Sequence, residues 1–241
     1  LGDVYKRQAL ISAFCILLYE GHRRSFPIMR WVLLLAFSWV SFVAGSKMIT
    51  LSPEDWELFL RDFSLPEITE KNLLGGLVTG FISLSAGKIL FGFKQNFADA
   101  FAYVIPLSVA IQRVGCFLNG CCHGTPANVP WAVSYSEGTL AHFHQFEIGL
   151  INGQELFTLP VHPVQLYETV GCIIVVLILL RLARILKAGG SLMLASLILF
   201  SLQHFIVEFF RDPLAHTGFL RTEGALSQLQ WLIIFLVIIL L

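Results

Sequence analysis

Residues 112–124 read QRVGCFLNGCCHG, and the apolar run before them, residues 100–111, carries no charged side chain. Arg113 therefore stands where a lipid-spanning helix tolerates an ionised group only if that group faces the bundle interior and meets a partner. An arginine in such a place is a functional hypothesis by default. Two simpler interpretations are a structural ion pair and a side chain that reaches along the helix to the membrane surface.

The composition is that of a polytopic membrane protein. Of 241 residues, 56% are hydrophobic and 13% are charged, which excludes an ordinary soluble domain. The formal net charge is zero, so nothing indicates a nucleic-acid partner. Apolar runs that can cross about 30 Å of hydrocarbon predict an all-α fold with about seven transmembrane helices. They lie at residues 9–19, 31–49, 73–91, 99–117, 164–180, 191–210 and 226–241.

The charges in the connections predict an orientation. Basic side chains concentrate in three of them, at residues 22–30, 92–98 and 181–190. By the positive-inside rule these connections are cytoplasmic, so the N-terminus is outside and the C-terminus is cytoplasmic. Residues 112–124 then lie at the outer face. The connection at 211–225 is outside too, and its Arg211 and Arg221 run against the rule.

The start of the chain is set apart from the fold. Residues 3–8, DVYKRQ, read like the translation of a sequencing adapter, and no initiator Met precedes them. We interpret residues 1–8 as an artefact. Residues 9–241 are expected to form a single transmembrane domain that is truncated at its N-terminus, and the end at Leu241 within an apolar run suggests truncation there as well.

Two local patterns predict packing and exposure. Gly76 and Gly80 form a small-xxx-small pattern, which we interpret as close packing of two helices. The long connection at 120–161 carries aromatic residues that suit the membrane interface. Its histidines, His142 and His144, are expected to be solvated.

The topology brings polar residues of three spans to one membrane depth. Arg113 ends one span, the motif HPVQLYE at 162–168 begins the next, and Gln203 to Arg211 end the third. Gln165 and Glu168 are three residues apart and share a helix face. A carboxylate at that depth needs a cation, and Arg113 is the obvious candidate.

The third cluster is expected to form a stripe on one helix. His204, Glu208 and Arg211 stand at positions i, i+4 and i+7, so they should point inward together. A buried polar network that only fixes helix register is the alternative.

Histidines and cysteines supply the reactive candidates. Each polar cluster holds a possible general base near neutral pH, namely His123, His162 and His204. Three cysteines next to His123 could bind Zn²⁺, or two of them could form a disulfide. Their spacing is not that of a C-x-x-C pair and no second pair follows, so small-residue packing is the preferred interpretation of Cys116, Cys121 and Cys122.

Taken together, these motifs resemble the prolipoprotein diacylglyceryl transferase family. Residues 112–124 resemble its signature Gly-Arg-x-Gly-Asn-Phe-x-Asn-Gly-Glu-x-x-Gly, HPVQLYE resembles its HPxQLYE, and FIVEFFRDP at 205–213 resembles its EFFR segment. The resemblance covers residues 9–241. It implies a bacterial inner-membrane enzyme, multi-pass, with its active site toward the periplasmic face. Such an enzyme moves a diacylglyceryl group from phosphatidylglycerol to the thiol of a lipobox cysteine, releasing glycerol phosphate.

The resemblance also implies partners and site residues. The partners would be phosphatidylglycerol, the prolipoprotein signal peptide and membrane lipids, with no cofactor and no metal ligand. The candidate catalytic residues are Arg113, His123, His162, His204, Glu208 and Arg211. The candidate substrate-binding residues are Gly115, Asn119, Gly124, Gln165, Tyr167 and Glu168. Four positions depart from the family pattern, where His, Asn, Glu and Arg are replaced by Leu74, Cys116, Cys121 and His204.

Other functions stay open at this stage. One is a membrane thiol, redox or metal-binding module on a retained transferase scaffold, built on the three cysteines. A second is a related lipid transferase with a different acceptor. A transporter is a third, but it predicts an inverted internal repeat, and the sequence shows none.

Overall fold

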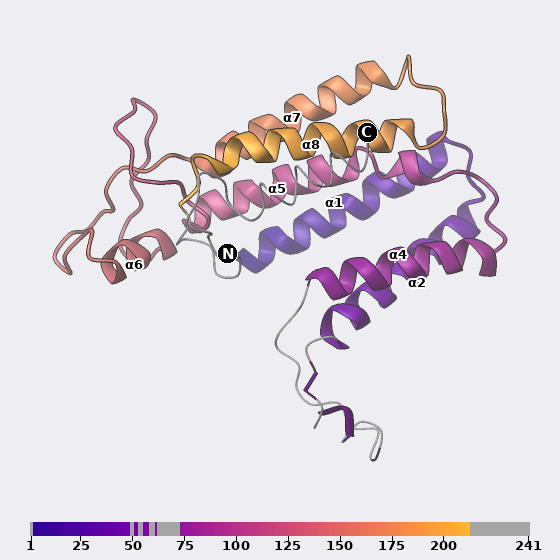
Figure 1. Ribbon diagram of the computed structural model, residues 1–241, viewed down its shortest axis with the longest axis horizontal. Helices are drawn as coiled ribbons and strands as arrows, with labels where there is room; N and C mark the ends of the chain where they lie inside the picture. The colour runs from indigo at the N-terminus through magenta and orange to yellow at the C-terminus, as the bar shows by residue number, and fades with distance from the viewer. Residues whose placement is uncertain (1, 49–50, 53–54, 58–60, 62–72, 213–241) are drawn as a thin grey trace. The chain divides into compact units, whose positions relative to one another are not determined.

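A computed structural model describes residues 2–48, 51–52, 55–57, 61 and 73–212. Within them the chain is helical, with isolated β-bridges and no strand, which confirms the all-α class for this part. The main elements are α1 (Gly2–Arg23), α2 (Ile28–Met48), α4 (Leu73–Leu90), the 3₁₀ helix η1 (Ala98–Ala100), α5 (Val104–Asn119), α6 (Leu140–Glu147), α7 (Val164–Leu182) and α8 (Ser191–Glu208) (Figure 1).

Four described helical segments are long and apolar enough to cross a membrane. They are Ile28–Met48, Ala98–Asn119, Val164–Leu182 and Ser191–Glu208, and Val78–Leu90 is a shorter apolar helix. They correspond to four of the predicted spans. The expected span at 226–241 lies outside the described residues, and the number of seven spans and their orientation stay predictions.

The described chain divides into two compact units, and α2 and α4 belong to the unit of residues 18–95. These two helices pack side by side (Figure 1). A Cβ atom at Gly76 would lie 2.9 Å from the ring of Phe42, so only glycine allows this approach. The hydroxyl of Thr79 donates to the carbonyl of Ser41 across the interface at 2.9 Å. The interpretation of Gly76 as a packing residue is therefore confirmed.

In the other unit, whose described residues are 2–17 and 96–212, α7 packs against both α5 and α8 (Figure 1). Asp99 fixes the start of α8, because its carboxylate accepts hydrogen bonds from the backbone N–H groups of Gly190 and Met193, each at 2.9 Å. A carboxylate at this end of a helix satisfies free N–H groups and complements the helix dipole. Farther along α8, the Ser196 hydroxyl donates to the Ala102 carbonyl at 2.6 Å.

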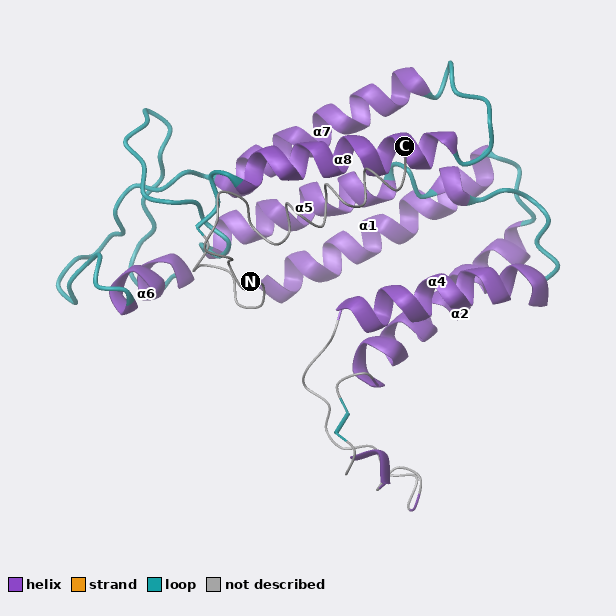
Figure 2. Ribbon diagram, viewed as in Figure 1, coloured by secondary structure: helices purple, strands orange, loops and turns teal. Residues whose placement is uncertain are grey.

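The opposite end of this unit carries the long connection between α5 and α7, drawn as loops around α6 (Figure 2). Helix α5 ends where Gly120 adopts the left-handed conformation, at a φ of 66°. Antiparallel bridges join Gly124 to Arg211 and Pro126 to Val161. The end of α8 is thus attached to the start of the connection.

Two details of the sequence predictions are wrong. Helix α8 ends at Glu208, so Arg211 does not continue the helical stripe of His204 and Glu208. His142 and His144 lie on α6 and not in a solvated loop. His142 is buried, with Nε2 2.7 Å from the carbonyl oxygen of Glu155. Both errors have the same physical reason. Tertiary contacts of the long connection, and not local sequence periodicity, determine where Arg211, His142 and His144 lie.

Candidate active site

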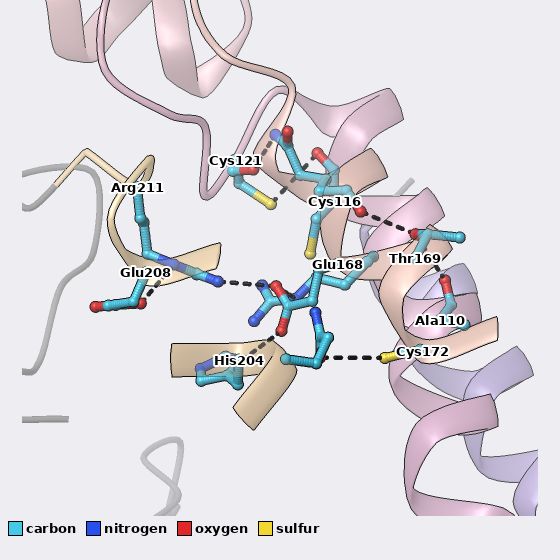
Figure 3. A network of polar contacts seen from close by, with 12 residues as sticks. Ala110, Cys116, Cys121, Glu168, Thr169, Cys172, His204, Glu208 and Arg211 are labelled. Atoms are coloured by element: carbon cyan, nitrogen blue, oxygen red, sulfur yellow. Dashed lines mark hydrogen bonds and ion pairs between the residues drawn. The ribbon is translucent and has the colours of Figure 1, made fainter. Parts of the chain in front are cut away.

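Glu168 is the centre of the candidate active site (Figure 3). It lies in the second turn of α7, and its side chain is 1% exposed. The Nε atom of Arg113 on α5 lies 2.7 Å from Oε2 of Glu168. The predicted pairing of Arg113 with a carboxylate of the 164–180 span is therefore confirmed. A buried carboxylate and a buried guanidinium are both stabilised by such close contact.

Two further side chains complete the contacts of Glu168. Nη2 of Arg211 donates to the same Oε2 atom at 2.8 Å. Nδ1 of His204 lies 2.8 Å from the other oxygen, Oε1. Because α7 begins at this end of the unit and α5 and α8 end there, the three helices bring Arg113, Glu168 and His204 to one place. The segment after α8 brings Arg211. The predicted convergence of the three polar clusters is confirmed for Arg113, Glu168, His204 and Arg211.

Arg211 bridges two carboxylates. Its Nε atom lies 3.0 Å from Oε2 of Glu208, while its Nη2 atom holds Glu168. The backbone of Arg211 pairs with Gly124, where a Cβ atom would lie 2.5 Å from the carbonyl oxygen of Phe210. Glycine at 124 thus lets the two segments approach closely enough to place Arg211.

Gln165 holds the residues that follow α5. Its Nε2 donates to the carbonyl of Cys121 at 2.7 Å and to the hydroxyl of Tyr135 at 3.2 Å. Burial raises the pKa of Tyr135 to about 12, although the Gln165 hydrogen bond acts in the other direction. Tyr135 is therefore a neutral phenol and a structural member of the site. Gly115 is buried on α5, and Asn119 is the last residue of that helix.

His162 and Tyr167 form a separate group. Nδ1 of His162 lies 3.0 Å from the hydroxyl of Tyr167, and that hydroxyl accepts a hydrogen bond from Nε1 of Trp131 at 2.6 Å. The backbone of His162 pairs with Gly124 and Thr125 at 3.0 and 3.1 Å. Among the described contacts, neither His162 nor Tyr167 touches Glu168.

His123 does not join Glu168 either. Its ring is 1% exposed and lies against His144, with ring centroids 5.3 Å apart. Burial lowers the pKa of His123, so its imidazole is neutral at neutral pH. No sequence pattern predicts His144 and Asp212 as neighbours of His123, because the three residues lie in different segments with no motif spacing.

The three cysteines of the 112–124 stretch gather beside Arg113. The Sγ atoms of Cys116, Cys121 and Cys122 all lie within 4.8 Å of one another. Hydrogen bonding with Cys116 and Cys122, followed by burial, raises the pKa of Cys121, so this thiol is protonated. Leu74, another position that departs from the family pattern, is the second residue of α4 and lies in the other unit.

An arrangement of this kind can bind an anion and move a proton. Each guanidinium has five N–H donors, and Arg113 contacts Glu168 through its Nε atom, so donors remain that can bind an anion. A carboxylate accepts but does not donate, so His204 bound through Nδ1–H presents Nε2 as a base. Helices that are long and apolar enough to cross a membrane surround this polar site, which is typical of an integral membrane protein with an internal polar centre.

Comparison with known proteins gives the family. Residues 72–241 match the family model described as prolipoprotein diacylglyceryl transferase. The chain belongs to this family.

Relatives in several bacteria agree with this assignment. The chain is 33% identical over 170 residues to a phosphatidylglycerol–prolipoprotein diacylglyceryl transferase of Mannheimia succiniciproducens, covering 68% of this chain and 56% of that protein. It is 28% identical over 222 residues to the protein of the same name in Aeromonas hydrophila, covering 87% and 73%. For the Campylobacter jejuni protein of that name the identity is 32% over 167 residues, covering 67% and 53%. The chain thus spans about half the length of two of these relatives.

Proposed function

We propose that this chain is a transferase that moves a diacylglyceryl group from phosphatidylglycerol to the thiol of a lipobox cysteine in a prolipoprotein. The observation that carries the proposal is the convergence of Arg113, His204 and Arg211 on the buried Glu168. Membership of the family and the names of the relatives support the choice of substrates.

The reaction needs a base and an anion site. The cysteine sulfur attacks the glyceryl carbon that carries the phosphate, so an S–C bond forms and the C–O bond to phosphate breaks. Glycerol phosphate leaves with the bonding electrons and gains a negative charge on oxygen. The thiol proton passes to a base, because the thiolate and not the thiol is the nucleophile.

Arg113 and Arg211 are the proposed partners of the phosphate. A guanidinium binds phosphate oxygens in pairs and stays charged, so it stabilises the leaving group as its charge develops. Glu168 and Glu208 position the two guanidinium groups through contacts of 2.7 to 3.0 Å. Positioning matters because a donor fixed in advance needs no reorganisation during the reaction.

His204 is the proposed general base. Its contact with Glu168 fixes the ring and places the proton on Nδ1, which leaves Nε2 to accept the thiol proton. His162 and His123 are less well placed for this role, since their contacts are with Tyr167 and with His144. His204 stands at the position where the family carries an arginine, so it would add a base where a cation is lost.

The proposed setting is the bacterial plasma membrane. Both substrates are anchored in the membrane, and the apolar runs of the sequence support seven spans. The charges of the connections support an N-terminus and a site at the outer face, with the C-terminus in the cytoplasm. Residues 9–241 would form one transmembrane domain, with residues 1–8 as an appended artefact. Gly115, Asn119, Gly124, Gln165 and Tyr167 would line and hold the substrate site.

A second candidate function rests on the gathered thiols of Cys116, Cys121 and Cys122. On this reading the chain is a thiol or metal module, and its ion pairs are structural. The raised pKa of Cys121 argues against a reactive thiolate there, so we rank this function second.

One assay separates the two functions. The purified chain is mixed with phosphatidylglycerol micelles and a lipobox peptide, and peptide mass is followed. The transferase predicts that Arg113→Ala loses at least about 100-fold in rate, while a Cys116, Cys121 and Cys122 triple serine variant keeps its activity. The exposed Arg184 supplies the control Arg184→Ala, which should match the wild type. The opposite ranking would support the thiol module.

A further inference from the structure

Two imidazoles and a carboxylate meet in a second cluster, separate from the contacts of Glu168. His123 follows α5, His144 lies on α6 and Asp212 follows α8, so three different segments supply the cluster. One ring nitrogen of each histidine and one carboxylate oxygen of Asp212 all lie within 4.8 Å of one another. His123 and Asp212 are buried, with exposed fractions of 1% and 6%. The cluster is therefore a compact donor set shielded from solvent.

The tautomer of His123 is fixed by its backbone neighbour. Nδ1 of His123 lies 3.0 Å from the carbonyl oxygen of Gly124. Since a carbonyl only accepts, Nδ1 carries the proton and Nε2 presents a lone pair. This Nε2 atom is buried and has no hydrogen-bond partner among the residues that the structure describes. Histidines that bind metals commonly donate their other ring N–H to a backbone carbonyl in this way.

His144 has the same unsatisfied character. Both of its ring nitrogens are buried without a hydrogen-bond partner in the described part of the chain. Buried polar atoms are nearly always paired, with protein, water or an ion. A neutral His144 carries one N–H and one lone pair, so among the described residues His123 and His144 each present an unpaired lone pair beside the carboxylate of Asp212. A cation accepts such lone pairs.

The backbone holds two of the three residues in place. The N–H of Asp212 donates to the carbonyl of His123 at 3.2 Å. Gly124, which follows His123, and Arg211, which precedes Asp212, pair through an antiparallel bridge. His123 and Asp212 are therefore fixed as neighbours before any ligand arrives, and α6 supplies the third donor from outside.

We propose that His123, His144 and Asp212 bind a divalent transition-metal ion, with Zn²⁺ as the best match. Two imidazoles and one carboxylate form a donor set that zinc uses, with a fourth position for water or another ligand. Bonds of about 2.1 Å in a tetrahedron separate the donors by about 3.4 Å. Because the donor atoms already lie within 4.8 Å of one another, they close by at most about 1.4 Å on binding. The ion would join α6 to the segment that carries Arg211 and thereby help to position that arginine.

Metal binding can be measured directly on the full chain. The protein is purified in detergent, any polyhistidine tag is removed, and the triple serine variant of Cys116, Cys121 and Cys122 serves as the background. Zinc content is determined by elemental mass spectrometry, and Co²⁺ is used as a spectroscopic probe. We expect one Zn²⁺ per chain and a Co²⁺ spectrum with visible bands but no thiolate charge transfer in the near ultraviolet.

Variants assign the ligands. His144→Gln and Asp212→Asn should each weaken Zn²⁺ binding by more than about 100-fold. Replacing a residue that only hydrogen-bonds to a metal ligand typically lowers the affinity by less than this. His142→Gln is the matched control, because His142 lies on the same helix but its Nε2 faces the Glu155 carbonyl. Circular dichroism and gel filtration establish that each variant folds. Two ligand variants are used so that the test remains possible if one of them fails to fold.

The proposal is overturned by any of three results. One is a folded background protein that takes up no Zn²⁺, which would assign the cluster to a bridging water. Another is unchanged binding in His144→Gln or Asp212→Asn. The third is a zinc content in the wild type that disappears entirely with the three cysteines.

Discussion

The Nδ1 atom of His204 lies 2.8 Å from the Oε1 atom of Glu168, so a histidine of α8 is oriented by a carboxylate of α7. The same carboxylate holds Arg113 and Arg211 through its other oxygen. One buried side chain thus orients the proposed base and both proposed anion-binding groups. Replacing one of these residues should therefore change the positions of the others, and the effects of two replacements should not be additive, since all of them contact Glu168.

His204→Gln should lower the transfer rate by about 100- to 10,000-fold, the range for loss of a general base. Glutamine keeps a polar group near Glu168 but cannot take up a proton. The measurement is the initial rate of peptide modification at saturating lipid. His22→Gln is the control, because His22 is exposed at the end of α1. If His162→Gln loses most of the transfer rate while His204→Gln stays active, His162 and not His204 is the general base.

Glu168→Gln should destabilise the folded protein by about 3–5 kcal/mol, because it leaves buried guanidinium groups without their counter-charge. Thermal or denaturant unfolding in detergent micelles measures this. The control Glu147→Gln changes an exposed carboxylate on α6 and should stay within about 0.5 kcal/mol of the wild type. Equal unfolding midpoints for both variants would mean that the ion pairs contribute little.

The sequence predicted much of the site through one physical constraint. A charge within an apolar helix must find a partner, so Arg113 and Glu168 could be paired before the fold was known. The place of Arg211 was harder to predict, because the apolar residues Phe209 and Phe210 favour continuing the helix. The chain turns there instead, since the backbone of Arg211 pairs with Gly124.

The burial of side chains in the long connection could not be predicted from the sequence. No helical or strand period in residues 120–161 says which side chains turn inward, so the environments of His142 and His144 depend on tertiary contacts. Asp99 shows the same limit, because its two hydrogen bonds go to Gly190 and Met193, some ninety positions away.

Tyr135 should make the protein sensitive to alkaline pH. Its pKa is raised from 10.0 to about 12 on folding, so the folded state holds the phenol proton more tightly. The stabilisation is complete below about pH 10 and is lost as the pH rises toward 12. It amounts to on the order of 2 kcal/mol. Tyr135→Phe should therefore show a shallower loss of stability over this pH range, and an unchanged slope would contradict the burial of a neutral phenol.

Gly124→Ala should weaken the junction between the α5–α7 connection and the end of α8. The added methyl would lie 2.5 Å from the Phe210 carbonyl oxygen and 2.7 Å from Cβ of His162. Overpacking of this kind costs about 1–3 kcal/mol, and transfer should fall because Arg211 shifts. Gly153→Ala is the control, since its nearest neighbour, the Phe146 ring, is 3.5 Å away. Equal activity of both variants would show that this junction does not position Arg211.

The most direct test of the account is the stoichiometry of the transfer reaction. Purified chain, phosphatidylglycerol and a lipobox peptide are incubated, and the modified peptide and released glycerol phosphate are quantified together by mass spectrometry. We expect equal amounts of the two products, with a peptide that gains the diacylglyceryl group without phosphate. We expect no glycerol phosphate when the peptide cysteine is replaced by serine. Folded protein that releases none with the cysteine peptide, or that attaches phosphate to the peptide, would contradict the account.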